Sequence, residues 1–184
     1  MNYYYLASSL PPVTMDEAPR MSLSDFVELC DDHLVARDSL ALRAVLEDGV
    51  ASDHPTVSKW REKETQLRNT IAKARAHHKK LDPSPYVREH EDFDTAIELA
   101  VDEAFATGSP LGREKALDAC RWSLIEEIEG YNAFSAAAVL SYALKLRLAI
   151  RWASFDEETG KQEVESMVNR QPGDEGIDTD TDEE

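Results

Sequence analysis

The chain has 184 residues and a net charge of −17, with 42% hydrophobic and 31% charged residues. This length and composition suit one globular domain with a single large core and a tail. The acidic balance argues against a protein that binds nucleic acid over its general surface, because such binding depends on Lys and Arg side chains that neutralise phosphates. The sequence also lacks a signal peptide pattern and any long uninterrupted apolar run, so we expect a soluble cytoplasmic protein that does not insert into a membrane.

The first dozen residues are predicted to form an extended arm. Tyr3, Tyr4 and Tyr5 favour a pleated segment, which Pro11 and Pro12 end. Three aromatic rings are too apolar to be left in water. The arm therefore either packs on its own domain or is donated to a partner.

Two short helices are predicted next. Ser22 or Ser24 can cap the first, and Asp38 can cap the second, which Gly49 ends. Together they form a short helical hairpin. Their apolar positions are Leu23, Phe26, Val27, Cys30 and Leu34, followed by Leu40, Leu42, Val45 and Leu46.

A much longer helix is predicted from Thr56 to about Lys80, with Asp53 and Pro55 at its start and the break at Pro83 after its end. It should pack lengthwise against another helix, because a seam recurs at alternating steps of three and four residues. The seam residues are Val57, Trp60, Glu64, Leu67, Ile71, Ala74 and His78. The other faces carry a basic ridge, which is either solvated or binds a partner. The ridge residues are Lys59, Arg61, Lys63, Arg68, Lys73, Arg75, Lys79 and Lys80.

Three further helices are predicted in the second half of the chain. Asp92 or Asp94 starts one that ends at Gly108, and the next continues to Gly130. The stretch 131–152 is the most continuously apolar of the sequence and is predicted to be the central helix, since its apolar residues cover most of its circumference.

The end of the chain is predicted to be a disordered acidic tail. From Asp156 onward, twelve acidic residues stand against two basic ones, a net charge of −10, and few large apolar residues could offset the ordering entropy. The predicted fold is therefore all-α: a helical bundle over residues 1–157 with a long helical hairpin and a short N-terminal extended arm, followed by the tail over 158–184. The tail either confers solubility or competes with acidic partners for the basic ridge.

No complete catalytic or metal-binding pattern is found in the sequence. None of the five histidines follows a glutamate by three residues, as the ligand pair of a di-iron bundle requires. Cys30 and His33 would supply half a zinc site, and the turn from Gly108 to Glu114 lacks the Gly-Lys-Ser/Thr of a phosphate loop. Cys30 and Cys120 are expected to be free thiols. We therefore expect a protein that is not an enzyme and holds no cofactor or metal.

Three parts of the sequence resemble a known family. They are Tyr3–Pro11 at the N-terminus, Ser22–Phe26 at a helix start, and Tyr142–Arg147 with Arg151–Trp152 in the predicted central helix. Together they resemble an uncharacterised family of short bacterial proteins encoded among the subunits of V/A-type ATPases. That family also looks like a reduced relative of the helical C (or d) subunit, which caps the membrane ring and couples it to the central stalk.

The resemblance implies a role in proton or sodium transport as a non-catalytic subunit or assembly factor of a V/A-type ATPase. It would act by helical contacts with ATPase subunits on the central-stalk or membrane-ring side, in the cytoplasm at the membrane periphery. Two other classes remain open: a free-standing acidic adaptor or chaperone-like protein, and an unrecognised helical-bundle enzyme. We expect large aromatic and arginine side chains to make the partner contacts. These candidates are Tyr3, Tyr4, Tyr5, Trp60, Arg61, Arg68 and Arg75.

Overall fold

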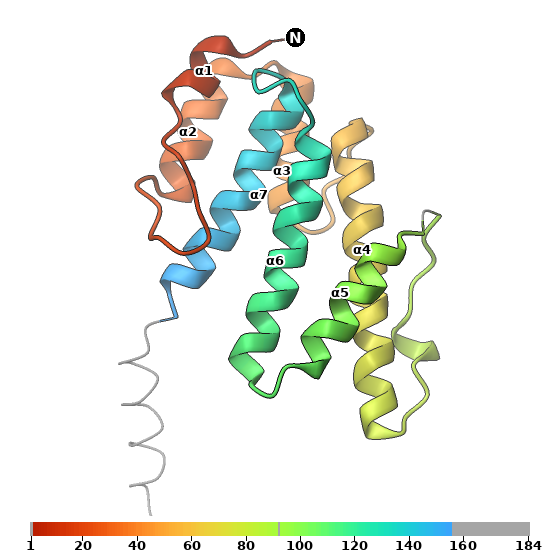
Figure 1. The fold of residues 1–184 in the computed structure, drawn as a ribbon. Coiled ribbons are helices and arrows are strands. Elements are labelled where there is room, and N and C mark those ends of the chain that lie inside the picture. The colour runs from red at the N-terminus through yellow and green to blue at the C-terminus, as the bar shows by residue number, and fades with distance from the viewer. Residues whose placement is uncertain (1, 92, 156–184) are drawn as a thin grey trace, which may run out of the picture. The chain divides into compact units, whose positions relative to one another are not determined.

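The structure, a computed structural model, describes residues 2–91 and 93–155. The chain divides into two units, Met1–Ala153 and Ser154–Glu184. The described residues form seven α-helices, all in the first unit, so the predicted all-α fold is confirmed (Figure 1). The predicted acidic tail, 158–184, lies outside the described residues.

The helices are α1 (Tyr4–Ser9), α2 (Leu23–His33), α3 (Ala36–Leu46), α4 (Pro55–Lys79), α5 (Thr95–Ala106), α6 (Pro110–Glu129) and α7 (Ala136–Ala153). A short 3-10 turn, η1 (Ser84–Tyr86), follows α4. Within these described segments, the helices are accompanied by one isolated bridge, between Asn2 and Ser135, and no strand.

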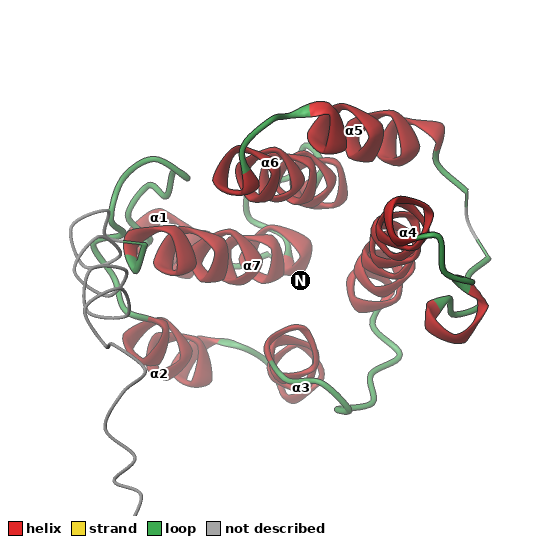
Figure 2. Ribbon diagram, turned by 90° about the horizontal axis from the view of Figure 1, so that it is seen from below, coloured by secondary structure: helices red, strands yellow, loops and turns green. Residues whose placement is uncertain are grey.

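α7 is the central helix of the first unit, as predicted. It lies between α6 on one side and α2 and α3 on the other (Figures 1 and 2). The helix begins at Ala136 and not at Tyr131, because the preceding residues form a turn. In that turn the side chain of Asn132 accepts a hydrogen bond from the N–H of Phe134, and Ser135 caps the helix by accepting one from the N–H of Ala138.

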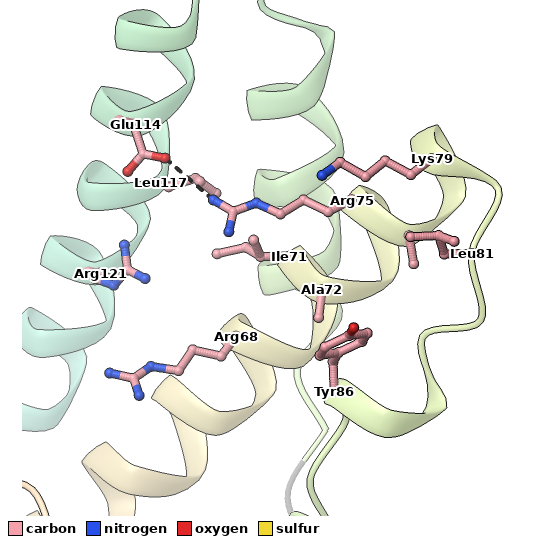
Figure 3. Close-up of a pocket in the computed structure, with 11 residues that line it drawn as sticks. Arg68, Ile71, Ala72, Arg75, Lys79, Leu81, Tyr86, Glu114, Leu117 and Arg121 are labelled. Carbon is pink, nitrogen blue, oxygen red and sulfur yellow. Dashed lines mark ion pairs between the residues drawn. The ribbon is translucent and has the colours of Figure 1, made fainter. Parts of the chain in front are cut away.

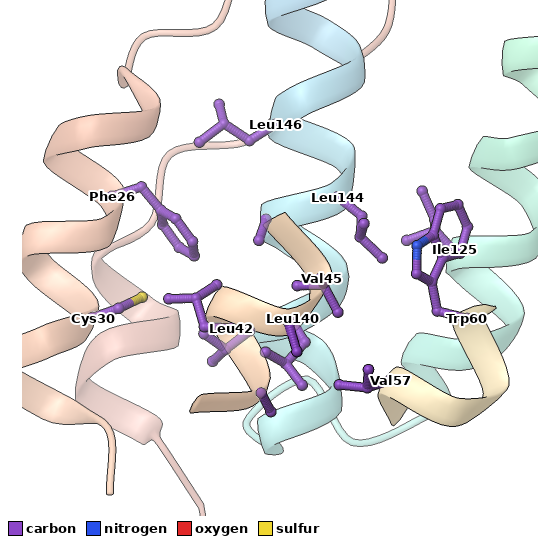
Figure 4. Close-up of a cluster of buried hydrophobic side chains, with 14 of the residues drawn as sticks. Phe26, Cys30, Leu42, Val45, Val57, Trp60, Ile125, Leu140, Leu144 and Leu146 are labelled. Atoms are coloured by element: carbon purple, nitrogen blue, oxygen red, sulfur yellow. The ribbon is translucent and has the colours of Figure 1, made fainter. Parts of the chain in front are cut away.

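The buried apolar side chains form two clusters that α4 and α6 connect. The first cluster gathers α1, α2, α3 and α7 with the start of α4 and with Ile125 of α6 (Figure 4). The second cluster lies between α4, α5 and α6. With 25 residues, α4 is long enough to place Val57 and Trp60 in the first cluster and Leu67 and Ile71 in the second. This confirms that α4 packs lengthwise against other helices.

The N-terminal segment is mainly a helix, so the prediction of an extended arm is corrected. The backbone N–H of Tyr3 donates to the carbonyl of Phe134, and its hydroxyl donates to Asp38 at 2.5 Å. These two anchors leave Tyr3 5% exposed, and its carbonyl accepts the N–H of Ala7 in the first turn of α1. Tertiary contacts thus override the β propensity of the tyrosines. Of the two alternatives, the segment packs on its own domain.

The starts of α2, α4 and α5 follow the predicted local chemistry in whole or in part. The side chains of Ser22 and Asp94 accept backbone N–H groups at the starts of α2 and α5, as predicted, and Pro55 occupies the first turn of α4. The cap of α4 is the ring of His54, which follows Asp53 and whose Nδ1 accepts the N–H of Thr56 at 3.2 Å.

Asp38 does not cap α3, contrary to the prediction. α3 begins at Ala36, and Asp38 lies buried in its first turn. The Asp38 carboxylate accepts the hydroxyl of Tyr3 and lies 3.6 Å from Nε2 of His54. This buried polar cluster therefore ties α1, α3 and the start of α4 together.

The burial of two tyrosine hydroxyls and one cysteine thiol predicts that the protein loses stability at high pH. Burial, with the hydrogen bond to Asp38, raises the pKa of Tyr3 to about 12 from its usual value of 10. Burial also raises the pKa of Tyr142 to about 12 and that of the Cys30 thiol to about 12 from 9. Because the unfolded chain releases these protons first, the free energy of unfolding should fall from about pH 9 to about pH 12.

Urea denaturation at several pH values would measure this loss. Tyr3→Phe should flatten the decline above about pH 10 and also weaken the fold by roughly 1.5–3 kcal/mol at pH 7, since a hydrogen bond to a carboxylate is lost. The matched control is Tyr5→Phe, because Tyr5 is 79% exposed. A pH profile that is the same for Tyr3→Phe and for the unchanged protein would contradict the prediction.

Two further features of the described chain concern the length of its apolar helices and the state of its cysteines. Within residues 2–91 and 93–155, no helix is long and apolar enough to cross a membrane. Cys30 is buried and Cys120 is partly buried, and both are free thiols, as predicted.

Candidate functional site

Three of the residues predicted to contact a partner are structural. Tyr3 and Trp60 are 5% and 8% exposed and belong to the first hydrophobic cluster. The guanidinium of Arg61 donates to the carbonyls of Ala44 and Val50, so it holds the connection between α3 and α4. The side chains of these three residues are engaged in contacts within the fold, which argues against a partner contact for them.

The other two tyrosines, Tyr4 and Tyr5, lie at the surface, and we call them, together with Tyr131, the N-terminal aromatic patch. Their exposed fractions are 58%, 79% and 110%. Tyr4 contacts the ring of Phe134 at a centroid distance of 4.6 Å, and Tyr5 stacks on His33 at 5.8 Å. Figure 1 shows α1 and the turn before α7 at the same end of the first unit. Packed rings therefore hold Tyr4 and Tyr5 in place, whereas Tyr131 is fully exposed.

The remaining two candidates, Arg68 and Arg75, line a cleft of about 420 Å³ between α4, α6 and the segment after α4 (Figure 3). We call it the basic cleft. Ile71 and Leu117, 7% and 1% exposed, belong to the second hydrophobic cluster and form its apolar base. The full lining is Arg68, Ile71, Ala72, Arg75, Ala76, Lys79, Leu81, Tyr86, Glu114, Leu117 and Arg121.

A network of ion pairs joins the two helices of the cleft. Glu64 interrupts the predicted seam of α4, yet it is buried at 9% exposure. Its carboxylate accepts from Arg68 at 2.7 Å and from Arg121 of α6 at 3.1 Å, which compensates the charge. Burial alone would lower the pKa of Arg121, but Glu64 and Asp118 outweigh it and raise that pKa above its usual value. Arg121 therefore stays charged.

The same network continues from α6 to α7 through Asp118. This carboxylate is fully buried and accepts from Arg121 at 2.7 Å, from Arg151 at 2.6 Å and from the indole N–H of Trp152 at 3.0 Å. Arg151 also donates to Glu114, at 3.0 Å. The position of α6 relative to α7, and with it the far wall of the cleft, thus depends on buried charge pairing.

The predicted basic ridge of α4 is divided by the fold. Lys63 is 18% exposed and pairs with Asp94 at 2.7 Å, so it stabilises the start of α5. Arg61 is engaged in the connection between α3 and α4, as described above. Arg68 and Arg75 instead line the basic cleft, together with Lys79. The ridge is therefore not one continuous binding surface.

Reasoning from the sequence missed several residues of these two surfaces. Tyr131 was assigned to the central helix, whereas the positive φ of Gly130 and the Asn132 turn expose it. Leu81 and Tyr86 follow α4 in a proline-rich segment with no periodicity that could predict a wall of a cleft. The sequence did contain one usable signal for the ion-pair network. Asp118 follows Leu117 in an apolar helix stripe, and a carboxylate at such a position requires a partner.

The geometry of these sites offers features that suit the binding of another molecule. In the part of the chain that the structure describes, no group of three or more His, Cys, Asp or Glu side chains is placed to hold a metal ion. The basic cleft offers cations over an apolar base, and the aromatic patch offers flat apolar area. Both are typical of surfaces that bind another molecule.

One comparison with known proteins bears on the second half of the chain. Residues 100–171 match a family described as "Protein of unknown function (DUF2764)". The matched stretch includes α6 and α7, which carry Asp118 and Arg151. No curated protein and no solved structure matches the chain.

Proposed function

We propose that this protein is a non-catalytic subunit or assembly factor of a V/A-type ATPase and that it binds ATPase subunits through the N-terminal aromatic patch. The resemblance of Tyr3–Pro11, Ser22–Phe26 and Tyr142–Arg147 to proteins encoded with such ATPases supports the proposal. One observation carries it: the first of these segments presents Tyr4 and Tyr5 to solvent, at 58% and 79% exposure. Large aromatic side chains at a surface are the residues that dominate binding energies.

The patch is already ordered before a partner binds. Tyr3 anchors α1 to the turn before α7 and to α3, and Phe134 and His33 support the rings of Tyr4 and Tyr5. Side chains that are held in place lose less conformational entropy on association. A helical partner can therefore dock on this end of the bundle without rearranging it.

The proposal predicts that ATPase subunits are recovered with this protein. From cells that make a V/A-type ATPase, the tagged full-length protein should recover the subunits of that enzyme, identified by mass spectrometry. The double variant Tyr4→Ser with Tyr5→Ser should lower the recovery at least about tenfold, because two binding hot spots are removed. Leu99→Ser is the matched control, since Leu99 is 64% exposed on α5 and lies outside the patch.

Two outcomes would contradict this function. If the tyrosine variant recovers as many ATPase subunits as the unchanged protein, the patch is not the contact. If the unchanged protein recovers basic client proteins and no ATPase subunit, it is a free-standing acidic adaptor. A native-mass comparison of the recovered complexes would separate these outcomes from simple misfolding of the variant.

The proposal also predicts that the protein by itself neither hydrolyses ATP nor binds a metal ion. The purified protein is expected to release no phosphate from ATP, because its sequence has no phosphate loop. It should also retain no stoichiometric metal after dialysis, since complete ligand patterns are missing from the sequence. Phosphate release should be assayed across fractions of a final size-exclusion step. Activity that follows the protein peak, or one equivalent of metal in it, would refute the prediction.

A further inference from the structure

We infer that the basic cleft binds an acidic amphipathic helix contributed by a partner protein. The helix lies along α4, and its carboxylates pair with Arg68, Arg75 and Lys79. Its apolar side chains contact Leu81 and Tyr86. This inference goes beyond the proposed function, because the cleft and the N-terminal aromatic patch are separate surfaces that can be tested separately.

The local charge of the cleft is opposite to that of the whole chain. The protein has 37 acidic and 20 basic residues, yet the cleft is lined by four cations, Arg68, Arg75, Lys79 and Arg121, and one carboxylate, Glu114. A positive cleft attracts acidic segments of other molecules. Charge complementarity therefore selects an acidic occupant.

The cations of α4 stay largely exposed to solvent, although Arg68 also donates to Glu64 at 2.7 Å. The side chains of Arg68 and Arg75 are 58% and 61% exposed, and Arg75 approaches Glu114 at 3.7 Å. An exposed pair of this kind contributes little stability, so a partner carboxylate can replace Glu114 at small cost. Arg121, in contrast, is 17% exposed and is engaged by Glu64 and Asp118. The first two arginines and Lys79 are thus the recognition groups.

Their spacing matches a helix and not a small anion. Arg68, Arg75 and Lys79 lie on one face of α4 and span about 16 Å at the rise of an α-helix. Figure 3 shows the guanidinium groups of Arg68 and Arg75 extending toward α6 at different levels of the cleft. One phosphate or carboxylate cannot contact both guanidinium groups. A partner helix with acidic residues at the same spacing can contact both of them.

The surface between the cations permits a helix to approach closely. Ala72 and Ala76 occupy α4 between Arg68 and Lys79 and line the cleft. Their small side chains leave room for the side chains of a second helix. The apolar base below them, Ile71 and Leu117, is buried in the second hydrophobic cluster, so the apolar contacts of that helix fall on the outer wall of the cleft.

The outer wall of the cleft is apolar and held in position. Leu81 and Tyr86 are 58% and 67% exposed, so both offer apolar area to a partner. The N–H of Leu81 donates to the carbonyl of Ala76, and Lys80 adopts the left-handed conformation that turns the chain back toward α4. Two hydrogen bonds between the side chain of Asn69 and the backbone of Arg88 fix the rest of the segment. The wall is therefore preorganised for binding.

A peptide titration tests the inference. The probe is a synthetic helical peptide of about 16 residues, with glutamates at the spacing of residues 68, 75 and 79 and leucines on the same face. Added to the isotope-labelled full-length protein, it should shift the amide resonances of Ala72, Leu81 and Tyr86. The double variant Arg75→Gln with Lys79→Gln should raise the Kd about fivefold, because two ion pairs are lost. The matched control, Lys59→Gln with Lys73→Gln, removes the same charge from α4 outside the cleft and should change the Kd less than about twofold.

Several results would overturn the inference. A peptide with glutamine in place of glutamate that binds equally well would show that charge does not select the occupant. Inorganic phosphate that reproduces the same shifts at equal concentration would show a site for small anions. Resonance shifts confined to other surfaces, or none at all, would show that the cleft takes no acidic helix. The titration contains no ATPase subunit, so its failure would not contradict the proposed function. A failure to recover ATPase subunits would likewise not contradict the binding of an acidic helix in the cleft.

Discussion

Leu144→Asp is expected to abolish cooperative folding of the protein. Leu144 is 2% exposed on α7 and belongs to the same cluster as Val45 of α3 and Ile125 of α6 (Figure 4). An aspartate at this position would be an unpaired charge in the core, at a cost of several kcal/mol, and about 2 kcal/mol of leucine burial would also be lost. Since a domain is stable by only about 5–15 kcal/mol, such a change removes most of the stability.

Thermal unfolding followed by circular dichroism would measure this effect. The unchanged protein should show one cooperative transition, and Leu144→Asp should show none. Leu40→Asp is the matched control, since Leu40 is 48% exposed on α3, and it should keep a cooperative transition. If Leu144→Asp melts cooperatively at the temperature of the unchanged protein, the centre of the core has been misassigned.

Asp118→Ala is expected to destabilise the protein by about 3–5 kcal/mol. The fully buried carboxylate is shared by Arg121 and Arg151, and it also accepts the indole N–H of Trp152. Removing it leaves two guanidinium groups close together near the interior with less compensating charge. Because these contacts join α6 to α7, the basic cleft should lose its defined shape along with the stability.

Urea denaturation of matched variants would isolate the role of the Asp118 charge. Asp118→Asn keeps the size and one acceptor oxygen, so it should lose less stability than Asp118→Ala. Asp102→Ala removes an exposed carboxylate from α5 and should stay within about 0.5 kcal/mol of the unchanged protein. Equal stability of Asp118→Ala and Asp102→Ala would mean that the buried network contributes nothing measurable to the fold.

The two surfaces differ in how they depend on the rest of the fold. The aromatic patch requires the anchoring of Tyr3 to Phe134 and Asp38, which joins the N-terminus to α3 and to the turn before α7. The basic cleft requires the ion pairs of Glu64 and Asp118 with Arg121. Variants that break one set of contacts should therefore affect one surface first, which allows the two binding hypotheses to be separated within a single protein.

The sequence by itself determined six of the seven helices of the described residues. Ser22, Asp94 and Pro55 start their helices as predicted, and the apolar stretch that ends at Trp152 contains the central helix. These features are local: a cap acts within three residues, and a helix face repeats every 3.6 residues. A pattern of this kind is visible in the sequence before any partner helix is known.

The tertiary structure alone decided which candidate side chains reach the surface. Tyr3 and Asp38 are 35 residues apart, and their hydrogen bond turns the predicted arm into α1 and removes Tyr3 from the surface. Glu64 and Arg121 are 57 residues apart, and their ion pair joins the two helices of the basic cleft. Contacts between residues so distant in sequence leave no periodic signal, because they depend on how the helices pack and not on what each helix contains.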